Sequence, residues 1–311
     1  MQKKVVDISI VVPFYNESES VDTFFKTLIP ILKHIKLSFE ILCINDGSKD
    51  NTLDLLVHNK KKYSQIKIID LSRNFGKDAA LTAGIDFCDG NCLIPIDCDL
   101  QDSPDLIADM IKKWKEGFEV VLAKRIDRSQ DTIFKRITAE WFYKVHNWLS
   151  DLKLPENVGD FRLMDRKVVN ALKNFPERKR FMKGLFAFAG FKTAVIEYKR
   201  PKRFKGVSKW SYVKLWNYAV DGITSFSVFP LKLSIYFGLL ITFLSFCKGI
   251  WIFFRVLLCG IDVPGYASQM IAMLFLGGVQ LISLGIIGEY VGRIYDESKQ
   301  RPIYIVRDVI K

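Results

Sequence analysis

The sequence predicts an α/β protein with a sheet of mostly parallel strands, helices on both of its faces, and two apolar helices behind it. Two observations predict this arrangement. Short β-branched segments alternate with amphipathic segments over residues 8–123, which is typical of parallel sheets covered by helices. Residues 231–258 and 263–290 are largely apolar, and each exceeds the roughly 20 residues that a membrane-spanning helix needs.

The elements of the sheet follow from local patterns. Residues 8–13 form a β-branched run that is typical of a buried strand, and Ser18 is a candidate N-cap for the helix behind it. Pro104 suits the first position of a later helix. The expected strands are residues 8–13, 39–44, 66–71, 92–96 and 120–123, and the expected helices are 18–35, 52–62, 77–88 and one that begins at 104.

Two charged residues lie within the first apolar segment. A charge at the middle of a spanning helix costs about 2.5–3.5 kcal/mol on insertion scales. Arg255 is close enough to one end of the segment to extend its side chain to the membrane interface. Two interpretations of Lys248 are open: a tilted, oligomer-facing lysine, or a contact with a lipid phosphate or a neighbouring subunit.

Two further amphipathic segments are rich in aromatic residues. Residues 131–150 suit a helix that packs on the core, or one at the membrane interface, because tryptophan and tyrosine favour the headgroup level. Residues 210–229 directly precede the first apolar segment, which favours the interfacial position. The expected division of the chain is a sheet domain at 1–200, a basic loop and interfacial helix at 201–230, an apolar hairpin at 231–292 and a tail at 293–311.

The chain carries a formal net charge of +12 although 49% of its residues are hydrophobic. A basic chain suggests nucleic acid or an anionic membrane as partner; the apolar segments favour membrane lipids, and no nucleic-acid recognition motif is present. Basic residues flank the hairpin while its connecting loop lacks them, which predicts that both termini are cytoplasmic. The first residues show no signal-peptide pattern, and the six cysteines show no metal-binding spacing.

Polar clusters follow three of the expected strands, at the edge where parallel sheets bind ligands. The clusters are Tyr15-Asn16-Glu17, Asn45-Asp46-Gly47-Ser48 and the stretch DCDLQD at residues 97–102. Carboxylates at positions 97 and 99 can converge on one divalent cation, which proteins often share with substrate phosphates. The spacing alone fits a solvated turn equally well, and the coincidence of three strand ends favours a ligand site.

Six motifs follow one another along the chain. They are VVPFYNE (residues 11–17), NDGSKDNT (45–52), RNFGKDAALTAG (73–84), DCDLQD (97–102), GDFRLMDR (159–166) and RFKGVSKW (203–210). In this order they resemble the polyprenyl-phosphate glycosyltransferases of glycosyltransferase family 2, a group that includes bactoprenol glucosyltransferases and dolichol-phosphate mannose synthases. The resemblance covers nearly the whole chain, including both apolar segments.

The resemblance implies a GT-A fold, a nucleotide-sugar donor, a divalent metal (Mg²⁺ or Mn²⁺) and an inverting reaction. A metal suits that chemistry, because a departing diphosphate develops negative charge that a cation neutralises. Asn45 stands where many relatives have another aspartate. The roles implied are uridine and ribose binding for Pro13, Tyr15, Asn16 and Glu17, base or ribose binding for Asp46, donor phosphate for Lys77, metal and pyrophosphate for Asp97 and Asp99, and the sugar for Gln101 and Asp102.

The acceptor implied by the resemblance is a lipid phosphate. A phosphate monoester has a second pKa of about 6, so its oxygen is already a nucleophile and a strong base is less necessary. Asp160 is the candidate base or orienting group, while a structural role in which it pairs with Arg162 or holds a loop is equally open. The further candidates for the acceptor phosphate are Arg162, Arg200, Arg203, Lys205, Ser208 and Lys209, with Arg125 and Arg128 weaker. The loop that ends at Lys209 is alternatively a juxtamembrane basic run without a specific ligand.

The function implied is transfer of glucose from UDP-glucose to undecaprenyl phosphate at the cytoplasmic face of the bacterial inner membrane. The lipid-linked sugar would serve O-antigen or cell-envelope glycosylation through a separate flippase and a further glycosyltransferase. Alternatives are another donor sugar (mannose, N-acetylglucosamine or an aminoarabinose derivative), a processive polysaccharide synthase, and a non-enzymatic lipid- or nucleotide-binding module. The absence of a Gln-x-x-Arg-Trp motif disfavours the synthase, and the paired aspartates disfavour the module. A homo-oligomer, dimer or tetramer, is expected.

Overall fold

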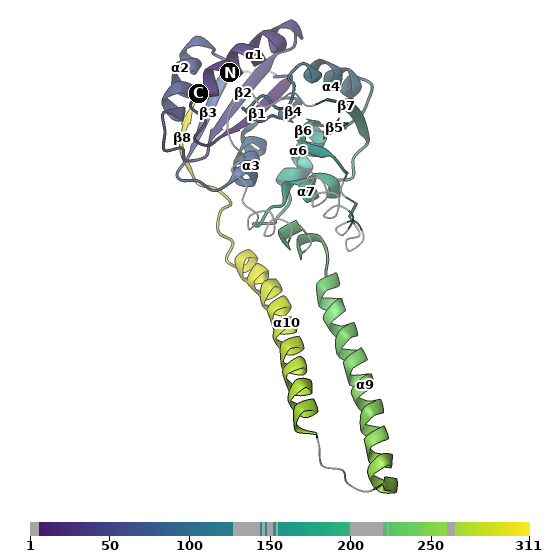
Figure 1. Ribbon diagram of the computed structural model, residues 1–311. Coiled ribbons are helices and arrows are strands. Elements are labelled where there is room, and N and C mark those ends of the chain that lie inside the picture. Colours follow the sequence, from purple (N-terminus) through teal and green to yellow (C-terminus); the bar gives the residue numbers. More distant parts are fainter. Residues whose placement is uncertain are drawn as a thin grey trace.

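The computed structural model describes residues 6–126, 144, 147, 152–153, 155–199, 220–222, 224–259 and 265–311. A sheet domain carries a long hairpin of two helices, α9 (Phe229–Cys259) and α10 (Tyr266–Ser298). After the hairpin the chain returns to the sheet domain, so that both ends of the described chain lie there (Figure 1). Most of the two aromatic segments at 131–150 and 210–229 is outside the described residues; residues 220–222 and 224–226 are helical.

The sheet has the strand order β7-β5-β6-β4-β1-β2-β3-β8. The four neighbouring strands β4-β1-β2-β3 are parallel, whereas β6 runs antiparallel to both β4 and β5, and β8 runs antiparallel to β3. The prediction of a mostly parallel sheet is therefore confirmed. The strands are β1 (Ile8–Phe14), β2 (Phe39–Asn45), β3 (Ile66–Leu71), β4 (Cys92–Pro95), β5 (Val120–Arg125), β6 (Val158–Asp165), β7 (Thr193–Tyr198) and β8 (Val306–Ile310).

Helices cover both faces of the sheet. They are α1 (Val21–His34), α2 (Thr52–Lys62), α3 (Lys77–Phe87), α4 (Leu106–Lys115), α6 (Arg166–Lys173) and α7 (Met182–Phe188). Two helices begin later than predicted. Helix α1 begins at Val21 with Ser20, and not Ser18, at its N-cap position, and the Ser18 N–H donates to Asp50 in the loop after β2. Pro104 lies in a turn, in which its carbonyl accepts from the Ile107 N–H, and α4 begins after it at Leu106.

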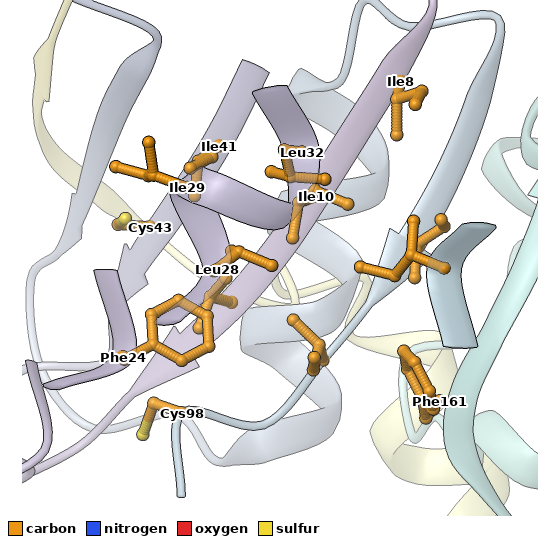
Figure 2. Packing of buried hydrophobic residues seen from close by; sticks show 14 of the residues in the cluster. Ile8, Ile10, Phe24, Leu28, Ile29, Leu32, Ile41, Cys43, Cys98 and Phe161 are labelled. Carbon is orange, nitrogen blue, oxygen red and sulfur yellow. The ribbon is translucent and has the colours of Figure 1, made fainter. Parts of the chain in front are cut away.

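Two hydrophobic clusters sandwich the sheet. Side chains alternate along a strand, so Ile10 and Val12 of β1 face α1, α2 and α4, while Val11 faces α3, α6 and α7. Figure 2 shows the first cluster, in which Leu28 and Leu32 of α1 lie beside Ile10 of β1. On the opposite face α3 approaches β1 so closely that a Cβ at Gly84 would lie 2.1 Å from a Val11 methyl carbon. These contacts fix the strands whose ends carry the site.

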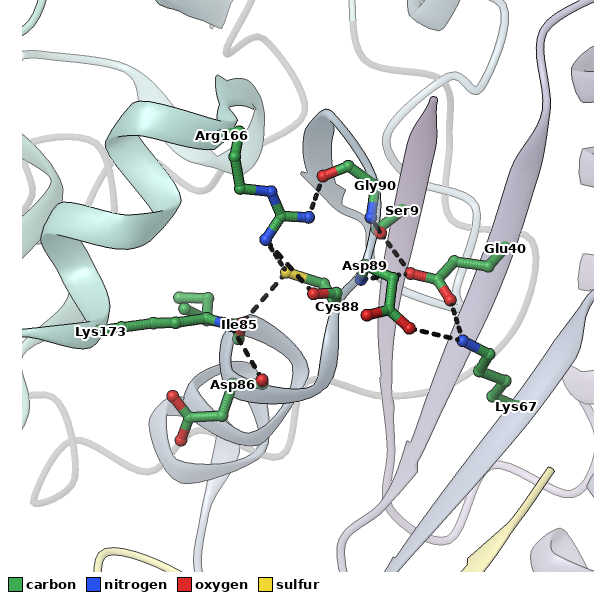
Figure 3. Close-up of polar contacts among 10 residues, drawn as sticks. All are labelled: Ser9, Glu40, Lys67, Ile85, Asp86, Cys88, Asp89, Gly90, Arg166 and Lys173. Carbon is green, nitrogen blue, oxygen red and sulfur yellow. Dashed lines mark hydrogen bonds and ion pairs between the residues drawn. The ribbon is translucent and has the colours of Figure 1, made fainter. Parts of the chain in front are cut away.

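A polar network lies at the amino edge of the parallel strands (Figure 3). Glu40 of β2 is 3% exposed, and one of its oxygens accepts from the Ser9 hydroxyl (2.5 Å) and the Asp89 N–H (2.7 Å). Its other oxygen lies 2.5 Å from the ammonium of Lys67, which also contacts the Asp89 carboxylate at 3.0 Å. Glu40 thus joins β1, β2, β3 and the turn before β4 through one buried carboxylate.

Replacing Glu40 with alanine is expected to lower the free energy of unfolding by about 3–5 kcal/mol, because buried donors and a cation lose their acceptor. Chemical unfolding of the detergent-solubilised protein measures the change. Asp89→Ala is the matched control, since its carboxylate pairs with the same lysine at the surface and should cost about 0–1 kcal/mol. Equal losses in the two variants would contradict the central role of Glu40.

The two hairpin helices are long and apolar enough to cross a membrane, over Phe229–Arg255 and Gln269–Ser298. Within α9, the Lys248 ammonium lies 4.2 Å and the Arg255 guanidinium 5.4 Å from the ring centroid of Trp251. Both cations therefore have an aromatic neighbour on their own helix. Helix α10 continues to Ser298, beyond the predicted end of the second apolar segment at residue 290.

The base of the hairpin is bonded to the sheet domain. The carboxylate of Glu297, near the end of α10, accepts from the backbone N–H groups of Arg178 (2.9 Å) and Lys179 (3.1 Å). Asp221 pairs with both Lys179 (2.8 Å) and Arg293 (2.6 Å). These charged contacts connect the segment before α7, the segment before α9 and the end of α10.

Candidate functional site

The candidate site lies at the carboxyl edge of the parallel strands, where β1, β2 and β4 end. Asn16, directly after β1, adopts a left-handed conformation (φ 52°). Its backbone N–H donates to the Ser48 hydroxyl (3.1 Å), and its side-chain oxygen accepts from the Lys49 N–H (2.8 Å). Asn16 therefore holds the loops after β1 and β2 together, and Tyr15 beside it is exposed at 37%.

Asp46, directly after β2, holds the loop that leads into α3. Its carboxylate accepts from the backbone N–H groups of Phe75 (2.7 Å) and Gly76 (2.9 Å) and from the Asn74 side chain (3.0 Å). Burial raises the pKa of Asp46, and the two backbone donors oppose that shift. Both oxygens are engaged by the chain itself, so Asp46 shapes the loop; its predicted contact with base or ribose stays a prediction.

Gly47 makes this arrangement possible. Its backbone is left-handed (φ 62°), and a Cβ there would lie 2.3 Å from the Arg73 carbonyl carbon. A side chain at position 47 would push the loop containing Asn74 away from Asp46. The close approach of the loops after β2 and β3 therefore depends on glycine.

Lys77, the first residue of α3, lies between two carboxylates. Its ammonium is 2.7 Å from Asp97, which follows β4, and 2.8 Å from Asp160 of β6. Burial disfavours the ammonium, but Asp160 and Asp97 outweigh it and hold the pKa of Lys77 well above its usual value. Burial likewise opposes ionisation of Asp160, yet Lys77 keeps the pKa of Asp160 below its usual value. Lys77 and Asp160 thus stay charged at neutral pH.

Asp78 lies beside this cluster, and its carboxylate accepts from the Met182 N–H of α7. Burial raises the pKa of Asp78 to about 7; the negative charge of Asp160 adds to the shift, and Lys77 and Lys183 oppose it. The folded protein binds this proton more tightly than the unfolded chain does. Asp78 therefore lowers the free energy of unfolding as the pH rises from its usual pKa of 3.8 towards 7.

Asp78→Asn should remove that loss. Between about pH 5 and about pH 8, the thermal midpoint of the variant is expected to fall less than that of the parent protein. Differential scanning fluorimetry in detergent measures both. Asp54→Asn is the control, because Asp54 occupies the first turn of α2 and is exposed. Parallel pH curves for parent and Asp78→Asn would contradict the raised pKa.

The acidic residues of the loop after Asp97 have different hydrogen-bond partners. Asp99 accepts from the Gln101 N–H at 3.1 Å across Leu100, which is left-handed (φ 53°). Asp102 is 3% exposed; its carboxylate accepts from the Tyr198 hydroxyl and lies 3.8 Å from Arg125. Burial, together with Asp102, raises the pKa of Tyr198 to about 12. Asp102 is thus bonded to β5 and β7, and its predicted contact with the sugar is untested.

Arg162 of β6 is also buried, at 4% exposure. It donates to the Gly159 carbonyl at 2.7 Å, and its guanidinium lies 4.2 Å from the ring centroid of Phe186 on α7. Its charge contributes to the lowered pKa of Asp160. The other predicted acceptor residues, Arg200, Arg203, Lys205, Ser208 and Lys209, lie outside the described residues.

The carboxylates of Asp97 and Asp99 suit a divalent cation that takes its remaining ligands from phosphate and water. Both side chains are partly exposed, and the Cys98 side chain between them is buried. Among the described residues, no three His, Cys, Asp or Glu side chains are grouped as a metal site. Mg²⁺ typically takes one or two carboxylates together with phosphate and water oxygens, so two carboxylates fit that chemistry.

The central pairing of Lys77 with Asp160 was not predicted. The motifs assigned Lys77 to the donor phosphate and considered Arg162 as the partner of Asp160. The two residues lie on α3 and β6, which the sheet brings together. Lys183 of α7 was likewise missed, although its charge acts on both Asp78 and Asp160. Lys183 lies in a short helix, and no sequence motif around it distinguishes it from other lysines.

Comparison with known proteins identifies the family. Residues 9–173 match the model of glycosyl transferase family 2, and residues 229–294 match that of the GtrB C-terminal hairpin. The glycosyltransferase sll0501 of Synechocystis is 53% identical, with 98% of this chain and 96% of that protein aligned. The bactoprenol glucosyl transferase of Shigella phage SfV is 50% identical, with 97% and 98% aligned. This chain is a glycosyltransferase with a GT-A fold and belongs to glycosyltransferase family 2.

Proposed function

We propose that this protein transfers glucose from UDP-glucose to undecaprenyl phosphate at the cytoplasmic face of the bacterial inner membrane, with inversion at the anomeric carbon. Relatives named bactoprenol glucosyl transferase align with 96–97% of the chain at 49–50% identity, and this observation carries the proposal. The charged cluster around Lys77 and the apolar hairpin support it, because the reaction joins a diphosphate donor to a lipid acceptor.

On the donor side, the loops after β1 and β2 and the loop at 72–76 would bind the nucleotide, with Pro13, Tyr15, Asn16 and Glu17 against the uridine and ribose. Asp97 and Asp99 would hold Mg²⁺ or Mn²⁺, and Gln101 would face the sugar. When bound, such a cation offsets the charge of a departing diphosphate. The Lys77 ammonium adds a fixed positive charge beside Asp97, 2.7 Å away, in the same place.

On the acceptor side, the nucleophile is an oxygen of the lipid phosphate, which is largely dianionic at neutral pH. Lys77 keeps Asp160 ionised, which suits a residue that orients a neighbour better than one that takes up a proton. We therefore assign Asp160 an orienting role, in which it holds the Lys77 ammonium towards the reacting phosphates. Arg162 and the basic residues at 200–209 remain the candidates for binding the acceptor phosphate.

The path of the chain supports a hairpin that enters and leaves the membrane on one side. The strands before the hairpin and β8 after it belong to the same sheet. If the chain between them crosses the membrane, it must cross it an even number of times. Basic flanks then favour the cytoplasmic side for the sheet domain and both termini. A homo-oligomer, and use of the product by a flippase and a further glycosyltransferase, are predictions of the same proposal.

The test is incubation of the purified protein with undecaprenyl phosphate, Mg²⁺ or Mn²⁺, and labelled UDP-glucose, UDP-N-acetylglucosamine or GDP-mannose in parallel. Radiolabel is expected in the lipid fraction with UDP-glucose, and the coupling constant of the anomeric proton should give the β-linked product. Omitting undecaprenyl phosphate should abolish lipid labelling. Labelling from another donor instead would show that glucose is the wrong sugar. No labelling from any donor would overturn the proposal.

A further inference from the structure

Strand β8, which follows the apolar hairpin, is bonded to the loop that precedes Lys77. The backbone N–H of Ser72, at the start of this loop, donates to the Ile305 carbonyl at 2.9 Å. The Ser72 carbonyl accepts from the Arg307 guanidinium at 2.7 Å. Both backbone polar groups of Ser72 are therefore held by residues that come after the hairpin.

Arg307 also reaches a buried carboxylate. Its other terminal nitrogen lies 3.4 Å from Asp70 of β3, which is 2% exposed. The second oxygen of Asp70 accepts from the side chain of Asn45 at 2.7 Å, and Asn45 is fully buried as the last residue of β2. Arg307 thus contacts, from the surface, the buried pair of Asp70 and Asn45, and Asn45 is followed directly by Asp46.

The same loop is held at its other end by Asp46, which binds the N–H groups of Phe75 and Gly76. Lys77 follows immediately and contacts Asp97 and Asp160. The position of the Lys77 ammonium therefore depends on two restraints: Asp46 behind it, and β8 at the start of the loop. Helix α3 is held at its far end as well, where the Tyr304 hydroxyl donates to Asp86 at 2.7 Å.

Arg307 contributes little to packing. Its side chain is 59% exposed, so removing it opens no cavity, whereas its two polar contacts are with the Ser72 carbonyl of the loop and with Asp70. A purely structural arginine in this place would affect stability and both substrates alike. Removal of an arginine that fixes the loop would instead weaken binding of only the ligand that the loop contacts.

We propose that Arg307 is a positioning residue for the nucleotide-sugar donor: through Ser72 and Asp70 it holds the 72–76 loop so that Lys77 faces the donor diphosphate. The inference rests on the proposed function only in taking the donor to be a nucleoside diphosphate sugar. By this proposal β8, which follows the apolar hairpin in sequence, contributes to donor binding without contacting the reacting atoms.

The test compares Arg307→Met with Arg301→Met in the full chain. Arg301 is exposed in the same connection, and its side chain makes no hydrogen bond or ion pair with the described residues, so it controls for loss of positive charge near the membrane. Isothermal titration with UDP should show about tenfold weaker binding to Arg307→Met and unchanged binding to Arg301→Met, since a charge-assisted hydrogen bond is lost. The KM for UDP-glucose should rise by the same factor, while the KM for undecaprenyl phosphate stays constant.

Arg307→Lys should recover part of the affinity, because one ammonium can pair with Asp70 but lacks the planar fork that also reaches the Ser72 carbonyl. Thermal midpoints of all variants are measured alongside. Unchanged UDP affinity in Arg307→Met, or a KM increase shared equally by both substrates, would overturn the positioning role. A parent protein that binds no UDP would instead overturn the proposed donor, which separates the two failures.

Discussion

Replacing Asp99 with asparagine is expected to reduce glucosyl transfer by about 100-fold to 1,000-fold, because the site loses one of two negative charges proposed to hold the divalent cation beside the diphosphate. The asparagine oxygen can still accept from the Gln101 N–H, so the loop retains its 3.1 Å hydrogen bond. Transfer of labelled glucose to undecaprenyl phosphate measures the loss. The thermal midpoint should stay close to that of the parent protein.

Asp109→Asn is the matched control for this change, since Asp109 lies exposed on α4 and its loss removes the same charge from the surface. Its activity should equal that of the parent. Titration with Mn²⁺ in the presence of UDP adds a readout other than turnover, and Asp99→Asn should bind Mn²⁺ more weakly. Near-normal turnover in Asp99→Asn would remove the carboxylate pair from the proposed mechanism.

Replacing Lys77 with methionine should reduce transfer by about 100-fold, because Asp97 and Asp160 lose the cation between them and the donor diphosphate loses a nearby positive charge. The change also alters stability in a pH-dependent way. Without Lys77 the pKa of Asp160 rises, since burial is no longer outweighed. The variant should therefore lose stability as the pH rises from about 4 to neutral, whereas the paired Asp160 of the parent is stabilising over that range.

Lys67→Met is a close control for Lys77→Met. Lys67 also lies between two carboxylates, those of Glu40 and Asp89, but at the opposite edge of the sheet (Figure 3). It should lower the thermal midpoint and leave the rate per folded molecule unchanged. If both variants lose transfer only in proportion to their folded fraction, Lys77 has a structural role and no other.

The first half of the sheet could be predicted because its strands are short, buried and separated by helices of clear periodicity, as with residues 8–14 and 39–45. Strands β6, β7 and β8 were not predicted, and for β6 and β8 the reasons differ. Residues 158–165 mix apolar with charged side chains, because Asp160 and Arg162 serve the site and leave no simple alternation. Strand β8 pairs with β3 across the whole apolar hairpin, and no local pattern indicates a partner so distant in sequence.

Sequence patterns name candidate site residues where one loop supplies several of them, as at Asp97 and Asp99. They do not predict the site where the fold joins distant segments. Lys77 meets Asp160 because α3 packs over the sheet that contains β6, and Asp102 accepts a hydrogen bond from Tyr198 of β7. The order of the motifs indicated the family, whereas the pairing of charges within the site depends on how distant segments meet in the folded protein.

The position of β8 also has a consequence for biosynthesis. The ribosome makes this strand after both apolar helices, so the outer edge of β3 has no β8 to pair with until the hairpin has left the exit tunnel. An open edge of this kind is a template for pairing with other chains, and nascent proteins that stall at this stage are exposed to aggregation and proteolysis. Completion of the sheet is therefore delayed until the apolar hairpin has been synthesised.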